Sequence, residues 1–321
     1  MNSETKRITD NFIAEFRNAQ PVCRWSGDKY AVMMASLMIG HEPVTETEAY
    51  REVQRIIKIN ASFFSLLRSG YAKDIVTAAV ASSADQQKAV EDITRIHSML
   101  KAGFHDSYKV IIAATMIFMC CDPHEYDETV AKTIRIYNDI KSNHPMIAWG
   151  KDIANCALLA LSGKDVSFAS RDYEDCYREV SNRYRNKSAA LYAACALSVF
   201  NGGCDIKTDK LVALHNNLKT ARLNFTSEGL EIIALMACMF GENPHAVINE
   251  IREVSSTLSY VKGLGNWSIG DKIRNMISAA IVIEAYTNNK KLTYLAKQVI
   301  LNVICSSLED DDAATVTIVT M

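Results

Sequence analysis

Two kinds of helical segment alternate along this chain, and the pair recurs about every forty residues. In the first kind, apolar residues stand three and four positions apart, as at Ile93, Ile96 and Leu100, which predicts a helix with one buried and one charged face. The second kind, such as residues 110–119, is apolar on all sides, so its helix must be covered by neighbours. A two-helix unit of this type cannot bury its apolar surface alone.

Two independent markers keep the same period. An aliphatic residue near the end of the first segment recurs at Leu67, Leu100, Ile140, Val180, Leu218 and Leu258. Paired alanines, which allow helices to approach closely, recur in the second segment at 78–79, 113–114, 193–194 and 279–280. Strand-like alternation is scarce. The sequence therefore predicts an all-α fold of about six tandem two-helix repeats, arranged as an α-solenoid or an α/α-toroid-like array, with open and closed forms both possible.

The repeat pattern also suggests boundaries within the chain. Residues 1–45 are expected to form N-terminal capping helices, and residues 46–289 the helical-hairpin repeat array. Residues 290–321 are expected to contain a C-terminal capping helix, ending near 307, and a tail that turns acidic at Glu309 and then β-branched. We interpret the acidic run, residues 309–312, as a solvated linker. The last residues either fray or dock as an extended segment, and we favour fraying.

Charge and hydropathy exclude several kinds of partner. The 321 residues carry 35 Lys and Arg against 37 Asp and Glu, scattered along the chain. A basic patch for nucleic acid is therefore not expected. The longest apolar stretches, residues 110–121 and 188–204, are too short or too interrupted to cross a membrane and read as buried core helices.

The cysteines and the N-terminus point to a cytoplasmic protein. The nine cysteines are an odd number, and most lie inside apolar runs without the spacing of a zinc site. Buried, reduced thiols are the expected state, which fits a reducing compartment. The first residues, 1–7, are charged and precede no apolar segment of the kind that a secretory signal requires.

No cluster of residues forms a recognisable catalytic, cofactor or metal site. The segment 120–127 brings two thiols, an imidazole and carboxylates together, but adjacent side chains on a helix diverge and no second ligand pair follows. The carboxylates at Glu46 and Glu48, and those of Asp172, Glu174 and Asp175, read as charges at helix starts rather than as an acid–base pair. Neither a phosphate-binding loop nor a hydrolase motif is present. We therefore expect no cofactor, no metal and no standard catalytic machinery.

One connection stands out as a possible ligand or partner loop. Residues 262–270 contain three glycines and a tryptophan between two helices of the last unit. The simpler interpretation is ordinary loop geometry with Ser268 capping the next helix. If the chain has a contact loop, its candidate residues are Gly263, Gly265, Asn266 and Trp267.

With these motifs in view, the chain resembles a family of uncharacterised bacterial proteins of about this length, found mainly in Gram-positive species. The resemblance rests on residues 100–104 with the alanines at 113–114, and on residues 263–265 with the alanines at 279–280. It extends from about residue 10 to 300. It implies no activity, cofactor or partner.

Two functional hypotheses follow. A protein- or peptide-binding or scaffold module is the first, because stacked helical units create extended concave surfaces. The alternative is an enzyme or small-molecule sensor whose site, in the concave groove or at a ring centre, uses polar residues from several units. A retained small molecule would favour the second hypothesis, and a stoichiometric protein partner the first.

Overall fold

The computed structural model is helical throughout its regular structure. It describes residues 1–23, 27–60, 70–104, 107–144, 153–241, 243–287 and 289–319. Within these ranges every regular element is a helix and there is no strand. The predicted all-α class is therefore confirmed.

The elements alternate between two sets of helices, followed by one long final helix. The odd-numbered helices are α1 (Ser3–Ala19), α3 (Thr47–Asn60), α5 (Gln86–Lys101), α7 (Tyr126–Asn143), α9 (Val166–Arg183), α11 (Cys204–Thr220) and α13 (Pro244–Ser259). The even-numbered helices are α2 (Asp28–Leu37), α4 (Gly70–Val80), α6 (Tyr108–Cys120), α8 (Ile153–Leu161), α10 (Lys187–Ser198), α12 (Leu230–Phe240) and α14 (Gly270–Tyr286). A short 3₁₀ helix, η2 (Pro123–Glu125), precedes α7, and α15 (Lys290–Val319) ends the chain.

The apolar patterns of the sequence explain which surfaces are buried. In α5, Ile93, Ile96 and Leu100 are fully buried on one face, and the Asp85 side chain caps the helix by accepting a hydrogen bond from the Lys88 amide at 2.9 Å. In α6, by contrast, every residue from Val110 to Ile117 is buried. The even-numbered helices therefore lie inside the odd-numbered ones.

The two periodic markers occupy equivalent places in the structure. The aliphatic markers lie in the last turns of α5, α7, α9, α11 and α13 and are at most 2 % exposed: Leu100, Ile140, Val180, Leu218 and Leu258. Leu67 lies outside the described residues. The alanine pairs are buried in α4, α6, α10 and α14. Both markers thus stand at buried positions in successive helices of each set.

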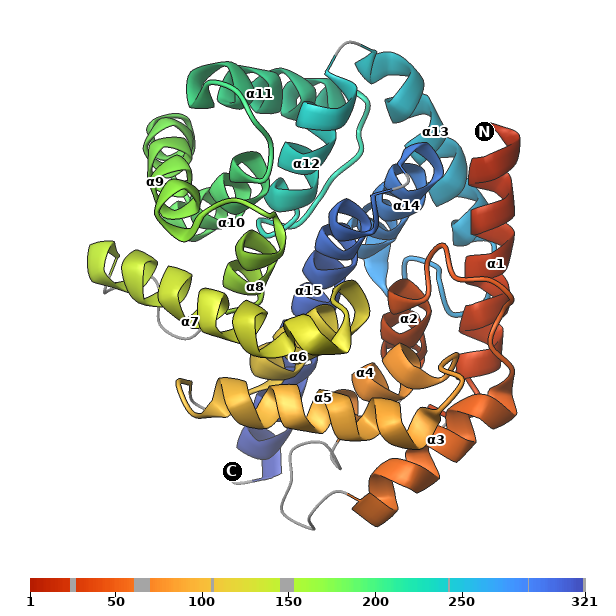
Figure 1. Cartoon of the computed structure of the whole chain (residues 1–321). Coiled ribbons are helices and arrows are strands. Elements are labelled where there is room, and N and C mark those ends of the chain that lie inside the picture. Colours follow the sequence, from red (N-terminus) through yellow and green to blue (C-terminus); the bar gives the residue numbers. More distant parts are fainter. Residues whose placement is uncertain are drawn as a thin grey trace.

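Successive helices of each set pack side by side along the chain. Each odd-numbered helix from α1 to α13 contacts the next odd-numbered one, and each even-numbered helix from α2 to α14 contacts the next even-numbered one. In addition, α1 contacts α13 and α14, so the first and the last helix pairs are neighbours (Figure 1).

Helix α15 runs through the middle of the molecule, in contact with α2, α6, α8, α12 and α14 (Figure 1). Its residues Leu295, Ile300 and Ile304 are at most 1 % exposed. The helix therefore covers much more than the last unit. Its backbone also stays helical beyond the expected end near residue 307, through the acidic run to Val319.

Among the described residues, no helix combines the length and the apolar character that crossing a bilayer requires.

Candidate functional site

The connection between α13 and α14, residues 260–269, exposes two large aromatic side chains, and we call it the aromatic loop. Trp267 is fully exposed and Tyr260 is 87 % exposed. Isolated apolar residues on a surface need no explanation, but a fully exposed tryptophan is rare because its indole buries a large area wherever a partner surface exists. The aromatic loop is therefore the first candidate for a contact surface.

The aromatic loop is anchored to the body of the protein. Leu264 is fully buried and Ile269 nearly so, on either side of the exposed Trp267. Gly263 has a φ of 95°, and a Cβ there would lie 2.7 Å from Cζ of Phe16 and 3.0 Å from the Asp28 carboxylate. Only glycine satisfies both the backbone conformation and this close approach.

A buried arginine completes the anchoring. One Nη of Arg274 donates a hydrogen bond to Oδ1 of Asn266 at 2.7 Å and lies 3.4 Å from the Leu264 carbonyl oxygen. Its Nε donates to Oγ of Ser255 at 3.3 Å. Burial lowers the pKa of Arg274, and Asp271 opposes this effect. The hydrogen bonds of Arg274 offset part of the free-energy cost of burying its guanidinium, and they hold the loop in place.

Among the four predicted loop residues, the structure separates supporting positions from the exposed one. Gly263 and Asn266 hold the loop in place, while Trp267 projects into solvent. At Gly265 an added Cβ would make an ordinary van der Waals contact with the Ser259 carbonyl oxygen at 3.7 Å, so this position does not require glycine for lack of space. The expected cap at Ser268 is not formed, because α14 begins at Gly270 and no side chain caps it.

A second candidate site is a cavity of about 320 Å³, which we call the polar cavity. It lies where the loop after α2 and the end of α14 meet the beginning of α15. Its ionisable and hydroxyl-bearing lining residues are His41, Glu42, Glu284, Thr293, Tyr294 and Lys297. No sequence motif predicts this set, because it joins segments about 250 residues apart and each contributes only two or three side chains.

The carboxylates of the polar cavity differ in how they are bound. Glu42 forms an ion pair with Arg7 and accepts a hydrogen bond from Nδ2 of Asn11 at 2.6 Å. The Glu284 carboxylate forms no side-chain hydrogen bond with a described residue, interacts electrostatically with Arg7, and lies where a Cβ of Gly40 would be. Glu284 is therefore available to a ligand.

The basic groups of the polar cavity influence one another. Burial lowers the pKa of His41, and the nearby Lys297 ammonium lowers it further. Lys297 is nearly buried and lies 4.6 Å from the centroid of the Tyr294 ring, an arrangement that favours the charged amine. Both effects favour the neutral form of the His41 imidazole, which has no hydrogen bond to a described residue.

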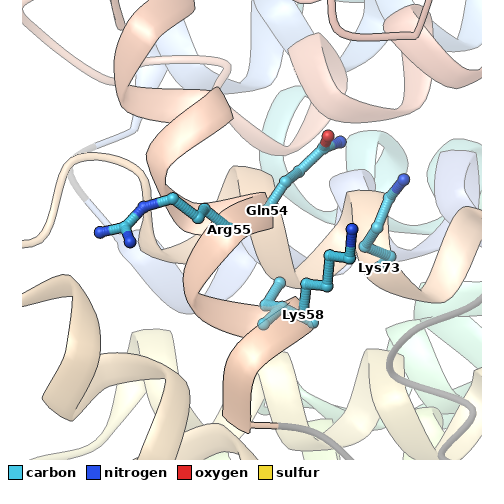
Figure 2. A pocket seen from close by; sticks show the side chains of 5 residues that line it. Gln54, Arg55, Lys58 and Lys73 are labelled. Carbon is cyan, nitrogen blue, oxygen red and sulfur yellow. The ribbon is translucent and has the colours of Figure 1, made fainter. Parts of the chain in front are cut away.

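A third cavity, of about 410 Å³, is lined by Gln54, Arg55, Ile57, Lys58 and Lys73 (Figure 2). Its positive charge is largely balanced nearby. Arg55 pairs with Glu52 at 2.6 Å, and Lys73 lies 3.7 Å from the buried Asp74, which also accepts a hydrogen bond from Gln54. Because Arg55 and Lys73 already have acidic partners, we do not expect this cavity to bind an anionic ligand.

Comparison with known proteins gives one match. A sequence model of the family described as "Protein of unknown function (DUF4003)" matches residues 15–308. The chain belongs to this family. None of the curated proteins and none of the solved structures gives a match. The region matched to the DUF4003 family contains both the aromatic loop and the polar cavity.

In this DUF4003 protein, the cluster at 120–127 has a structural explanation. Asp122 and Glu125 form a reciprocal cap at η2, in which the Glu125 carboxylate accepts a hydrogen bond from the Asp122 amide at 3.0 Å. Cys121 lies 3.4 Å from Oγ1 of Thr129. These contacts use the polar groups for local folding.

The carboxylates of α9 correct one sequence-based interpretation. Asp172, Glu174 and Asp175 lie in the interior of α9, not at its start, which Asp165 caps by accepting a hydrogen bond from the Ser167 amide at 2.9 Å. The interior carboxylates form ion pairs instead. The prediction was wrong because the helix begins earlier than the acidic cluster suggests.

Proposed function

We propose that this DUF4003 protein is a protein- or peptide-binding module that engages its partner through the aromatic loop. The full exposure of Trp267 on an anchored loop carries the proposal. Tryptophan and tyrosine are the residues that most often dominate binding energy at protein interfaces. The proposal keeps the cytoplasmic location expected from the cysteine pattern.

The anchoring of the aromatic loop supports the same proposal. Binding costs less when the contact side chains are already held in place, because little conformational entropy remains to be lost. The buried side chains of Leu264 and Ile269 anchor the loop backbone, and Arg274 holds Asn266, which precedes Trp267, through a hydrogen bond. The loop can therefore present its indole without refolding.

We further propose that the array of residues 46–289 is closed into a toroid-like ring. The supporting contacts are those of α1 with α13 and α14. In this arrangement, residues 1–45 link the two ends of the array, and residues 290–321 supply a helix that occupies its centre. A filled centre leaves the outer loops, rather than a concave groove, as the natural partner surface.

Replacing Trp267 by alanine should abolish partner binding without unfolding the protein. The side chain contacts solvent, so we expect the free energy of unfolding to change by less than about 0.5 kcal/mol. At a hot-spot position the loss of binding is at least about 2 kcal/mol, or more than tenfold in affinity. The measurement is quantitative mass spectrometry of proteins captured from lysate of the source organism on immobilised wild-type and variant chains.

The matched control is Phe168→Ala, which removes another exposed aromatic side chain from a different surface, on α9. A partner that depends on the aromatic loop is retained by Phe168→Ala and lost from Trp267→Ala. A photo-crosslinking residue at position 267 should attach to the same protein. Equal capture by the wild type and both variants would contradict the proposal.

The polar cavity favours a second candidate function, the binding of a small polar molecule. The supporting observation is that Glu284 and His41 line a cavity and that neither side chain forms a hydrogen bond with a described residue. The Glu284 carboxylate offers an acceptor to a cationic or hydroxyl-bearing group. A small polar ligand that carries such a group fits this lining best.

Native mass spectrometry of the purified protein should detect such a ligand. Glu284→Gln keeps the shape of the side chain but removes its charge, and we expect it to lower retention of the small molecule about tenfold or more. Glu91→Gln, at an exposed site on α5, should leave retention unchanged. Equal retention by both variants, or a protein that releases no small molecule on denaturation, would argue against the polar cavity as a site.

A further inference from the structure

Two cysteines from different helix pairs lie in contact, at a site outside the aromatic loop and the polar cavity. Sγ of Cys176, in the middle of α9, is 2.7 Å from Sγ of Cys204, at the start of α11. Cys176 is fully buried, whereas Cys204 is partly exposed. Neither takes part in a disulfide bond. A small reagent in solvent can therefore reach the Cys204 thiol directly, whereas the Cys176 thiol is accessible mainly to the Cys204 sulfur.

Charged groups surround this pair of thiols. Asp172 lies 3.4 Å from Sγ of Cys204, and its two carboxylate oxygens accept from the ammonium groups of Lys164 at 2.8 Å and Lys207 at 3.4 Å. These groups are also largely shielded from solvent: Cys204, Asp172, Lys164 and Lys207 are each partly or fully buried. Two positive charges face one negative charge, so the site carries an excess positive charge before any thiol ionises.

The two lysines also have a structural role, which explains why they stay in place. Lys164 donates to the carbonyl oxygen of Ser198 at 2.6 Å, and both ammonium groups lie within 3.2 Å of the Phe200 carbonyl oxygen. The Ser198 carbonyl lies in the last residue of α10 and the Phe200 carbonyl just beyond it, where backbone acceptors lack helical partners. The positive charge is thus fixed beside the thiols rather than free to move away.

This arrangement favours thiolate chemistry over metal binding. Ligand atoms of Asp172, Cys176 and Cys204 lie within 4.8 Å of one another, as a metal site would require. A divalent cation, however, would have to displace the ammonium groups from both oxygens of Asp172 and then remain next to them. An anionic sulfur at the same place is stabilised by those charges.

The surroundings of the two thiols have opposing effects on their ionisation. Burial raises the pKa of both Cys176 and Cys204, and the Lys207 ammonium opposes that rise in each case. The reactive thiolate is consequently a minor species at neutral pH, and its fraction grows as pH rises.

We propose that Cys204 and Cys176 form a hydroperoxide-reactive pair that closes to a disulfide. The Cys204 thiolate attacks one oxygen of the hydroperoxide, the O–O bond breaks, and the leaving oxygen departs as an alcohol or as water after taking up a proton. Cys204 is then a sulfenic acid. The Cys176 sulfur attacks it, the S–S bond forms, and the hydroxyl leaves as water with the proton of the Cys176 thiol. The two thiols lose two electrons and the hydroperoxide gains them.

The disulfide would add a covalent link between two successive helix pairs that the Lys207–Asp172 ion pair and packing already hold together. It links α9 to α11 across the intervening α10, so that α10 lies inside a covalent loop. A cross-link of this kind restricts the unfolded chain and raises the thermal unfolding midpoint. Oxidation at this site would therefore increase the thermal stability of the protein.

The test treats the whole reduced chain with a stoichiometric amount of hydrogen peroxide. Intact-mass spectrometry should show a loss of about 2 Da, and non-reducing peptide mapping should place the bond between Cys176 and Cys204. Dithiothreitol should reverse both results, and the oxidised form should unfold at a higher temperature than the reduced form. This measurement needs no variant, so a folding defect cannot obscure it.

Variants then assign the order of attack. Cys176→Ser should stop the reaction at a sulfenic acid on Cys204 that dimedone traps, whereas Cys204→Ser should leave Cys176 unmodified. Cys156→Ser, at a buried cysteine of α8, should form the same disulfide as the wild type. A bond between other cysteines, or no bond at stoichiometric peroxide, would overturn the proposal. So would stoichiometric binding of Zn²⁺ that protects Cys176 and Cys204 from alkylation.

Discussion

Replacing Ile300 by alanine is expected to lower the free energy of unfolding by about 3 kcal/mol or more. Ile300 is fully buried on α15, the helix that contacts α2, α6, α8, α12 and α14. Truncation removes three buried carbon atoms and leaves a cavity that helices held from several sides cannot close by moving together. The cost is therefore expected in the upper part of the range seen for such substitutions.

Urea-induced unfolding followed by far-ultraviolet circular dichroism measures this change. The control is Ser306→Ala, on the same helix at an exposed position, which should alter the free energy of unfolding by less than about 0.5 kcal/mol. A helix that merely covered the end of the array would tolerate Ile300→Ala nearly as well as the control. That outcome would contradict the central place of α15.

Local sequence patterns predict the helices well because they record which surface of each helix is apolar. The spacing of Ile93, Ile96 and Leu100 gives the buried face of α5, and the continuous apolar run of α6 gives its burial on all sides. The patterns do not record which helix covers which surface. The contacts of α1 with α13 and α14 join segments more than 200 residues apart, and no local signal specifies them.

The candidate sites differ in how far the sequence can predict them. Trp267 stands in a glycine-rich connection, so its loop is visible in the sequence, but its full exposure depends on how Leu264 and Arg274 are buried. The pair of Cys176 and Cys204 has no motif spacing, because helix α10 and its connections separate the two residues along the chain and the fold sets their distance. Sequence shows which residues are available, and the fold decides which of them meet.

A buried carboxyl group in contact with Gln54 and Lys73, two lining residues of the third cavity, gives a prediction about pH. Asp74, on α4, is 2 % exposed, and burial raises its pKa from 3.8 to about 6, against the opposing influence of Lys73. It accepts hydrogen bonds from Gln54 at 3.0 Å and from Cys23 at 3.8 Å. These partners do not offset the whole cost of removing the charged form from water.

The sign of the effect on stability follows from proton binding. Between pH 3.8 and about 6, folded Asp74 retains a proton that the unfolded chain has already lost. The folded state binds more protons in this window, so the free energy of unfolding falls as pH rises through it. The stabilising contribution is fully present below the lower value and is lost above the upper one. The full change corresponds to about 3 kcal/mol.

Asp74→Asn removes this dependence, because an amide of nearly the same shape does not ionise. The difference in free energy of unfolding between variant and wild type should shift in favour of the variant by about 2 kcal/mol between about pH 4 and about pH 7. Urea-induced unfolding at the two pH values measures it. Asp10→Asn, at an exposed position on α1, provides the control and should show no such shift. Because the prediction concerns a change with pH, any fixed packing cost of the asparagine cancels. A shift toward the wild type would mean that Asp74 is stabilised as a carboxylate, and that Lys73 and Gln54 outweigh burial.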